Sequence, residues 1–345
     1  MMQDCWQHRT FLTYCLTPFS GIYRIITSLR RLLFRLKIKK TTHFKIPIII
    51  VGNITVGGTG KTPLVIWLAN FLKQQGFKPG IVSRGYGGKN VCYPCAVTIN
   101  SDPQQVGDEA VLIARNTHCP MVVDPNRVRA VTQLLQDHDC NIVISDDGLQ
   151  HYALGRTIEI AVIDAARGFG NGFCLPAGPL REPVKRLDEV DFVIINGKLE
   201  HDNGSIQKRR SAQGALATEP TKEQAEINML LISADFCQLI NSVNTKKSDY
   251  FKNQTVHAVA GIGNPQRFFD SLRAMGLTII EHLFADHYNF QLKDFNFAKP
   301  DEWIIMTEKD AVKCQAFADD RYWYLPVRAE LPENFGAQLL GKISE

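Results

Sequence analysis

The segment 46–72 constrains the fold more than any other part of the chain. It begins with the apolar, β-branched run Ile46–Val51, which is typical of a buried parallel strand. Three glycines follow closely, Gly57, Gly58 and Gly60, and apolar residues then recur at helical spacing. A strand, a glycine-rich loop and a helix in this order direct backbone N–H groups and the positive helix end toward an anion. The sequence therefore predicts a site for the phosphates of a nucleotide.

Lys61 and Thr62 add the chemistry that such a loop needs, a cation for the phosphates and a hydroxyl for Mg²⁺. The common P-loop has a glycine five residues before its Gly-Lys-[Ser/Thr], where this chain has Thr55, so the loop is a variant. The alternative is a glycine-rich turn with an exposed lysine, which seldom carries both residues in these places. The predicted nucleotide-binding residues are Thr55, Val56, Gly57, Gly58, Thr59, Gly60, Lys61 and Thr62.

Strand and helix patterns alternate along most of the chain, which predicts an α/β fold. We expect a doubly wound parallel sheet of the P-loop NTPase type, with its sites at the carboxyl ends of the strands. Residues 199–228 are polar and poor in strand patterns, so they are predicted to be a connection, and the alternation resumes at Thr255. The expected domains are a basic N-terminal helix at 1–45, a P-loop domain at 46–225 and a smaller α/β domain at 226–345 that closes over the nucleotide.

Charge is distributed very unevenly along the 345 residues. Residues 1–101 hold fourteen Lys and Arg against one Asp, whereas the remainder has a net charge of −9. A block of one sign this long suggests an anionic partner. Within it, an apolar helical face lies beside basic residues, which favours an anionic membrane surface over nucleic acid because no aromatic residues are interleaved with the charges. The apolar face comprises Ile22, Ile25, Ile26, Leu29, Leu32, Leu33 and Leu36.

Two alternatives to this peripheral membrane helix can be weighed from the sequence. The apolar face could instead pack on the protein core. No stretch approaches the ~18 apolar residues that span a bilayer, and Arg9 and Pro18 interrupt the candidate core of a signal peptide.

The nine cysteines are scattered and odd in number, which indicates a reducing compartment. Cys92 and Cys95 form a lone C-x-x-C pair, which favours two loop thiols over a zinc site.

Asp146 and Asp147 follow the apolar strand pattern IVIS. Carboxylates at the end of a strand hold Mg²⁺ in P-loop enzymes, and the ion bridges the β- and γ-phosphates. Paired aspartates also form turns and helix caps. Because the chain also carries the glycine loop, we predict a magnesium site made by Thr62, Asp146 and Asp147.

A set of motifs resembles one known family. VGNITVGGTGKTP, SRGYGG, VGDEA, DDGLQH, LPAGPLREP, ADHYNF and TEKDAVK occur in the order seen in tetraacyldisaccharide 4′-kinases, from about Thr17 to the C-terminus. The resemblance implies transfer of the γ-phosphate of ATP, with Mg²⁺, to the 4′-hydroxyl of a tetraacyl glucosamine disaccharide 1-phosphate, a lipid A precursor. It also implies a peripheral or monotopic protein at the cytoplasmic face of the inner membrane. No protein partner is implied, and no nucleic-acid partner is expected.

The same resemblance implies roles for individual residues. Asp108 matches the base of the family, His287 the histidine that pairs with it, and Lys61 the lysine on the phosphates. A carboxylate oriented by an imidazole can take the proton of a sugar hydroxyl. Taken alone, Asp108 could merely cap a helix, and a lone histidine is usually structural. Many relatives have a second histidine where this chain has Tyr288.

On the expected boundaries, Asp108 and His287 lie in different domains, so closure would be needed to bring them together. The TEKD motif, Thr307–Asp310, resembles a family motif near the nucleotide. The candidate substrate residues that the resemblance adds are Ser83, Arg84, Tyr86, Gln150 and His151.

Two other functions remain open from the residues. One is a P-loop GTPase or ATPase that acts as a switch or delivers a metal, and the other is a membrane-bound structural ATPase. Guanine specificity usually needs Asn-Lys-x-Asp after a strand, and the chain has no such tetrapeptide. Nucleotide preference and the dependence of hydrolysis on a lipid acceptor would distinguish these functions from a kinase.

Overall fold

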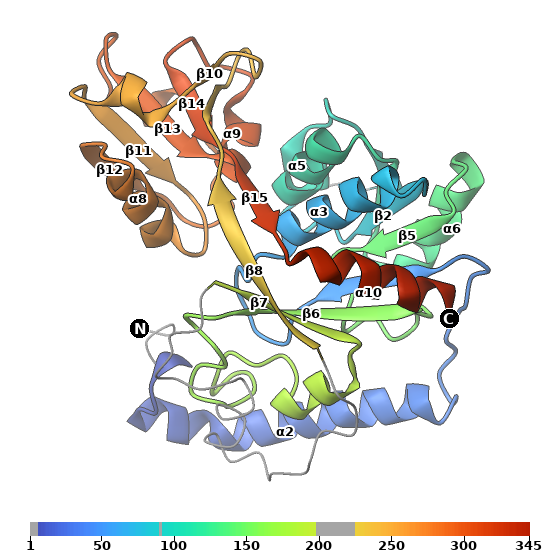
Figure 1. The fold of residues 1–345 in the computed structure, drawn as a ribbon. Helices are drawn as coiled ribbons and strands as arrows, with labels where there is room; N and C mark the ends of the chain where they lie inside the picture. Colours follow the sequence, from blue (N-terminus) through green and yellow to red (C-terminus); the bar gives the residue numbers. More distant parts are fainter. Residues whose placement is uncertain (1–5, 90–91, 198–224) are drawn as a thin grey trace. The chain divides into compact units, whose positions relative to one another are not determined.

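A computed structural model describes residues 6–89, 92–197 and 225–345, which form two compact units (Figure 1). The first unit contains the chain up to Arg84, Asn126–Leu230 and Glu330–Glu345. The second contains Gly85–Pro125 and Leu231–Ala329. Most of the connection predicted at 199–228 lies outside the described residues.

These units differ from the expected domains of 46–225 and 226–345. The segment 85–125, with Asp108, belongs to the second unit, and the C-terminal segment returns to the first. The reason is tertiary: α5 (Asp108–Thr117) is joined to α9 (Glu308–Cys314) by side-chain contacts, including Asn116 to Glu308 at 2.8 Å. Asp108 and His287 therefore share one unit, and the expectation that they lie in different domains was wrong.

The first unit is built on parallel strands, and all of them except β8 consist of buried residues. Their order is β8-β7-β6-β1-β5-β2, and every pair in this row is parallel. The sequence prediction of a parallel α/β sheet is thus confirmed. Strands covered on both faces are apolar throughout, as the run of isoleucines in β1 shows. The bounds are β1 (Ile48–Gly52), β2 (Pro79–Ser83), β5 (Ile142–Ser145), β6 (Ile158–Asp164), β7 (Phe192–Asn196) and β8 (Ala225–Ser233).

Three helices of this unit pack around the sheet: α3 (Lys61–Gln74), α6 (Arg127–Asp137) and α10 (Glu333–Ser344). The C-terminal α10 packs on α3 and β7, with the ring of Phe335 5.5 Å from Trp67 and 5.3 Å from Phe192. Gly336 is needed at this contact because a Cβ there would lie 2.7 Å from the ring of Phe71.

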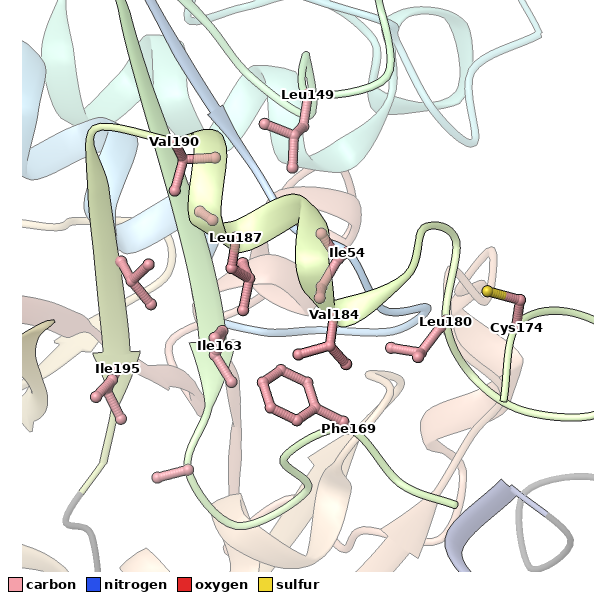
Figure 2. Close-up of a cluster of buried hydrophobic side chains, with 13 residues drawn as sticks. Ile54, Leu149, Ile163, Phe169, Cys174, Leu180, Val184, Leu187, Val190 and Ile195 are labelled. Carbon is pink, nitrogen blue, oxygen red and sulfur yellow. The ribbon is translucent and has the colours of Figure 1, made fainter. Parts of the chain in front are cut away.

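A second apolar cluster fills the space under the 3₁₀ helix η1 (Val184–Glu189). Figure 2 shows Phe169 at its centre, with Ile163 of β6 and Val184 of η1 close by. Ile54, directly before the glycine loop, belongs to the same cluster, so the start of that loop is held by buried packing.

The long N-terminal helix α2 (Phe11–Arg35) packs through a few residues only (Figure 1, blue). Ser20 donates to the carbonyl of Cys174 at 2.8 Å, and Tyr23 to the carbonyl of Arg181 at 3.2 Å. Its apolar side chains are largely exposed, so packing of that face on the core is excluded. The exposed ones include Phe11, Phe19, Ile22, Ile25, Ile26, Leu29 and Leu32. Among the described residues, no helix has both the length and the apolar character to cross a bilayer.

The second unit contains a mixed sheet in the order β10-β9-β14-β13-β11-β12, whose central strands are parallel. An antiparallel pair joins β3 (Cys95–Val97) to β4 (Met121–Val123). Helices α4 (Pro103–Val106), α8 (Pro265–Ala274), and the 3₁₀ helices η3 (Ser248–Phe251) and η4 (Leu292–Phe295) complete it, with α5 and α9. The strands are β9 (Phe236–Gln238), β10 (Thr245–Lys246), β11 (Val256–Ala260), β12 (Ile279–Leu283), β13 (Trp303–Thr307), β14 (Tyr322–Leu325) and β15 (Val327–Glu330).

Candidate active site

The glycine loop of the first unit lies between β1 and α3, as predicted. Gly60 caps α3 with a φ of 94°, a left-handed conformation that glycine adopts without strain. A Cβ at Gly60 would also lie 2.6 Å from the amide nitrogen of Asn196. That amide donates to the carbonyl of Thr59 at 3.0 Å, so the end of β7 holds the loop in place. The first N–H groups of a helix have no partner within that helix, so those at the start of α3 can bind an anion.

Asp147 lies among the cations of this loop. Its carboxylate is 3.5 Å from the ammonium of Lys61, and one nitrogen of Arg181 lies 3.0 Å from each of its oxygens. Burial alone would raise the pKa of Asp147, but Lys61 and Arg181 hold it far below the ordinary value. Its φ of 47° is left-handed, a conformation that aspartate tolerates better than most residues. Arg181 was not among the residues that the sequence singled out, although it lies in the LPAGPLREP motif.

Asp146, directly before it, is 2% exposed and accepts a hydrogen bond from the hydroxyl of Ser83 at 3.4 Å. Together with Thr62 at the start of α3, the two aspartates supply only hard oxygen donors. Such donors, completed by phosphate oxygens and water, are the ligands that Mg²⁺ prefers. The residues present therefore fit a magnesium ion.

Asp108 and His287 come together in the second unit. Asp108 is the first residue of α5, is 4% exposed, and accepts a hydrogen bond from the N–H of Glu109 at 2.8 Å. Nδ1 of His287 lies 3.1 Å from both of its carboxylate oxygens. The ring of Tyr86 meets the imidazole edge-on, with centroids 5.1 Å apart. Residues 179 positions apart in sequence thus form one hydrogen-bonded pair.

Two lysines of α9 surround this pair. Lys313 lies 3.7 Å from Asp108 and 2.7 Å from Asp310. Burial raises the pKa of Asp108, but the hydrogen bond from His287 and the charges of Lys309 and Lys313 bring it below the ordinary value. The same hydrogen bond raises the pKa of His287, against burial and Lys309, which lower it. Asp108 is therefore ionised and able to accept a proton.

The TEKD motif builds the end of β13 and the start of α9. Thr307 caps α9, and Asp310 accepts hydrogen bonds from the Thr307 hydroxyl at 2.7 Å and the N–H of Gly261 at 2.8 Å. Asp310 thus fixes the helix start, while Lys309 and Lys313 project from it into the Asp108 pair. The sequence showed the motif but gave no signal for what its lysine contacts.

The candidate substrate residues divide between the units. Ser83 ends β2 and Arg84 follows it in the first unit, whereas Tyr86 lies in the second, beside His287. The amide of Gln150 donates to Glu182 at 2.8 Å and to the carbonyl of Asn53 at 3.1 Å, which makes it a structural link of the first unit.

His151, the remaining candidate, is half-buried in the same unit. Burial, together with the charge of Arg127, lowers the pKa of His151 to about 4. It is therefore a neutral imidazole at physiological pH.

A parallel α/β sheet, a glycine loop that leads into α3 at Lys61 and an acidic pair at a neighbouring strand end define a nucleotide-binding protein of the P-loop class. The comparisons narrow this class. A family model described as tetraacyldisaccharide-1-P 4'-kinase matches residues 12–344, and the chain belongs to that family.

Proteins of known name match nearly the whole chain in sequence or in structure. A tetraacyldisaccharide 4′-kinase of Nitrosococcus oceani is 47% identical over 99% of this chain and 93% of its own length. A tetraacyldisaccharide 4′-kinase of Coxiella burnetii is 50% identical over 96% of this chain and 91% of its own length. The crystal structure of LpxK from Aquifex aeolicus in complex with ATP matches 96% of this chain and 99% of its own, with a TM-score of 0.77 and 26% identity. The predicted family and kinase function are confirmed.

Proposed function

We propose that this kinase phosphorylates the 4′-hydroxyl of a tetraacyl glucosamine disaccharide 1-phosphate with ATP, and that it does so with the residues described above. Asp108 takes the hydroxyl proton and His287 orients it. The observation that carries the proposal is the contact between Nδ1 of His287 and both oxygens of Asp108. The family and an ATP-bound relative support the substrates.

The first unit supplies the phosphate site in this proposal. The N–H groups at the start of α3 and the ammonium of Lys61 bind the phosphates of ATP, and Thr62, Asp146 and Asp147 would hold Mg²⁺. The ion, when bound, neutralises the charge that develops on the β- and γ-phosphates. Asp147 also helps to orient Lys61, because its carboxylate lies 3.5 Å from the ammonium.

The second unit handles the proton. Transfer of the phosphoryl group to the sugar oxygen requires loss of the hydroxyl proton, which passes to the carboxylate of Asp108. The N–H of His287 holds the carboxylate in one orientation. The ammonium of Lys313 keeps this carboxylate ionised before the hydroxyl proton arrives. After transfer the proton leaves Asp108 for solvent, which restores the base.

The proposal is tested with Asp108→Asn, which keeps the shape but cannot accept the proton. With γ-labelled ATP, Mg²⁺ and a lipid A disaccharide precursor in mixed micelles, we expect label in the lipid to form about 10²–10⁴ times more slowly. ATP affinity should be unchanged. Asp301→Asn, an exposed site in the same unit, is the matched control. A near-wild-type rate in Asp108→Asn would exclude Asp108 as the base, and label released only as free phosphate would revive the switch function.

We further propose that the exposed apolar face of α2 binds an anionic membrane surface at the cytoplasmic face of the inner membrane, as a peripheral contact. Ile25 is 68% exposed and Leu29 54%, and Arg24 and Arg30 lie on the same helix. An apolar stripe of this size on a helix rich in arginine suits the boundary between headgroups and acyl chains. Arginine near anionic lipid strengthens such binding.

Point variants test this proposal better than deletion, because the other side of α2 packs against the protein. The double variant Ile25→Ser with Leu29→Ser should weaken binding to phosphatidylcholine vesicles containing phosphatidylglycerol by about tenfold or more. Ser28→Gln is the control on the same helix, exposed and already polar. Unchanged vesicle affinity of the double variant would contradict the membrane contact.

A further inference from the structure

Lys309 has an arrangement that the reaction described so far does not use. Its ammonium lies 3.0 Å from Glu109, 3.3 Å from Asp286 and 3.4 Å from Nε2 of His287. The side chain is only 16% exposed. An ammonium has three N–H donors and no acceptor, so the three neighbours match its three donors. Nε2 of His287 is then the acceptor of one of these bonds.

An accepting Nε2 determines the protonation of the imidazole. A neutral histidine has one N–H, and if Nε2 accepts from Lys309, the proton lies on Nδ1 and points at Asp108. We propose that Lys309 is a positioning residue that keeps His287 neutral and protonated on Nδ1, so that Asp108 remains a competent base. This inference rests on the proposed roles of Asp108 and His287.

The charges around the imidazole explain why such a device is needed. Asp108 of α5 faces Nδ1, and Asp286, from the turn before it, lies 3.8 Å from Nε2. Two carboxylates on opposite edges would favour the imidazolium. Lys309 of α9 lies between Asp286 and Nε2 and opposes the second proton.

The remaining neighbours do not replace Lys309. Tyr86 meets the ring by its edge, and Lys313 of α9 contacts Asp108 rather than the imidazole. Burial lowers the pKa of Lys309, but Glu109, Asp108 and Asp286 raise it well above the ordinary value, so its charge is permanent.

The protonation of His287 changes the strength of the base. An imidazolium would give Asp108 a charge-assisted hydrogen bond and hold the carboxylate more firmly in its ionised form. Such a carboxylate is a weaker acceptor for the hydroxyl proton. A neutral imidazole still orients Asp108 but leaves its basicity higher. Lys309 thereby sets the lower pH limit of the kinase.

The experiment compares full-length wild type with Lys309→Met, Lys309→Gln and Lys309→Arg, and uses Lys293→Met as an exposed control in the same unit. Nitrogen-15 shifts of labelled histidine report the tautomer and titration of His287, whose signal is assigned by its loss in His287→Gln. The pH dependence of kcat/KM is measured in parallel. In the two neutral variants we expect the His287 titration and the acid limb of kcat/KM to move up together by about one pH unit. Arginine should largely restore both.

The possible outcomes separate this inference from the function on which it rests. An unchanged His287 titration in both neutral variants would overturn the role of Lys309, whatever happens to the rate. A higher KM for ATP with an unmoved acid limb would also overturn it and would make Lys309 a phosphate ligand. Wild-type rates in Asp108→Asn and His287→Gln would instead remove the proposed function while the titration shift remained measurable.

Discussion

The phosphate loop of the first unit and the charged cluster of the second are built in opposite ways. The loop is a contiguous stretch shaped by backbone, with Gly60 in a left-handed conformation and N–H groups as its working parts. The cluster consists of side chains from α5, α9 and the turn at His287, far apart in sequence. A backbone site can be read from a local motif, whereas a side-chain cluster depends on which distant elements pack together.

Charge is used differently in the two places. In the first unit, Lys61 and Arg181 share one carboxylate, Asp147. In the second, Lys309 lies between two carboxylates of its own, Glu109 and Asp286. We therefore expect the cations of the first unit to act on an incoming phosphate and those of the second to act on protonation.

The largest effect that separates the two regions is expected for Lys61→Met. Loss of a cation placed at the transferred phosphates should lower kcat/KM by about 10²–10³, since one preorganised electrostatic contact of this kind is removed. Unlike Asp108→Asn, this variant should also bind ATP more weakly in calorimetry. Equal ATP affinity in the two variants would erase the division between a binding region and a proton-handling region.

A smaller effect is expected for Arg181→Met. Without Arg181, Asp147 keeps its ion pair with Lys61, and the lysine is held more tightly away from the phosphates. We expect KM for ATP to rise about tenfold, the size of one charged hydrogen bond. Arg181→Lys should restore part of the loss, because charge returns without the fork geometry. A KM unchanged in Arg181→Met would show that the loop does not depend on this pair.

The smallest expected effect is a pH-dependent change in the stability of the second unit, which comes from the imidazole of His282. His282 hydrogen-bonds to His257 at 2.9 Å and stacks on Phe297, and burial together with His257 lowers the pKa of His282 to about 4. The unfolded chain, with a histidine pKa near 6.5, takes up the proton first. Stability from this site is therefore complete above about pH 6.5 and is lost as the pH falls toward 4.

We expect the Tm to be a few degrees lower at pH 5 than at pH 7.5, and the difference to shrink in His282→Gln. His287 has the opposite sign. Its raised pKa contributes stability at low pH that is lost as the pH rises through the folded value. An identical pH slope in His282→Gln and wild type would contradict this contrast.

The sequence predicts the backbone loop of the first unit better than the side-chain cluster of the second. The strand, the loop and Lys61 were identified from local spacing, and the parallel sheet from alternation. The expected domains differ from the two units chiefly at 85–125, because the alternation of strand and helix continues through this segment and does not reveal which unit α5 packs on. The pairing of Asp108 with His287 came from family motifs, and nothing in the TEKD motif indicated that Lys309 would reach Nε2 of His287.

The face of α2 that packs inward has a consequence for handling the enzyme. The hydroxyl of Tyr23 donates to the carbonyl of Arg181, whose guanidinium holds Asp147, which in turn holds Lys61. A helix proposed to lie in lipid is thus three contacts away from the lysine of the phosphate loop. A detergent that binds the exposed face of α2 can therefore shift Lys61 through these contacts. We expect the ATP affinity of the kinase to depend on the detergent in which it is measured.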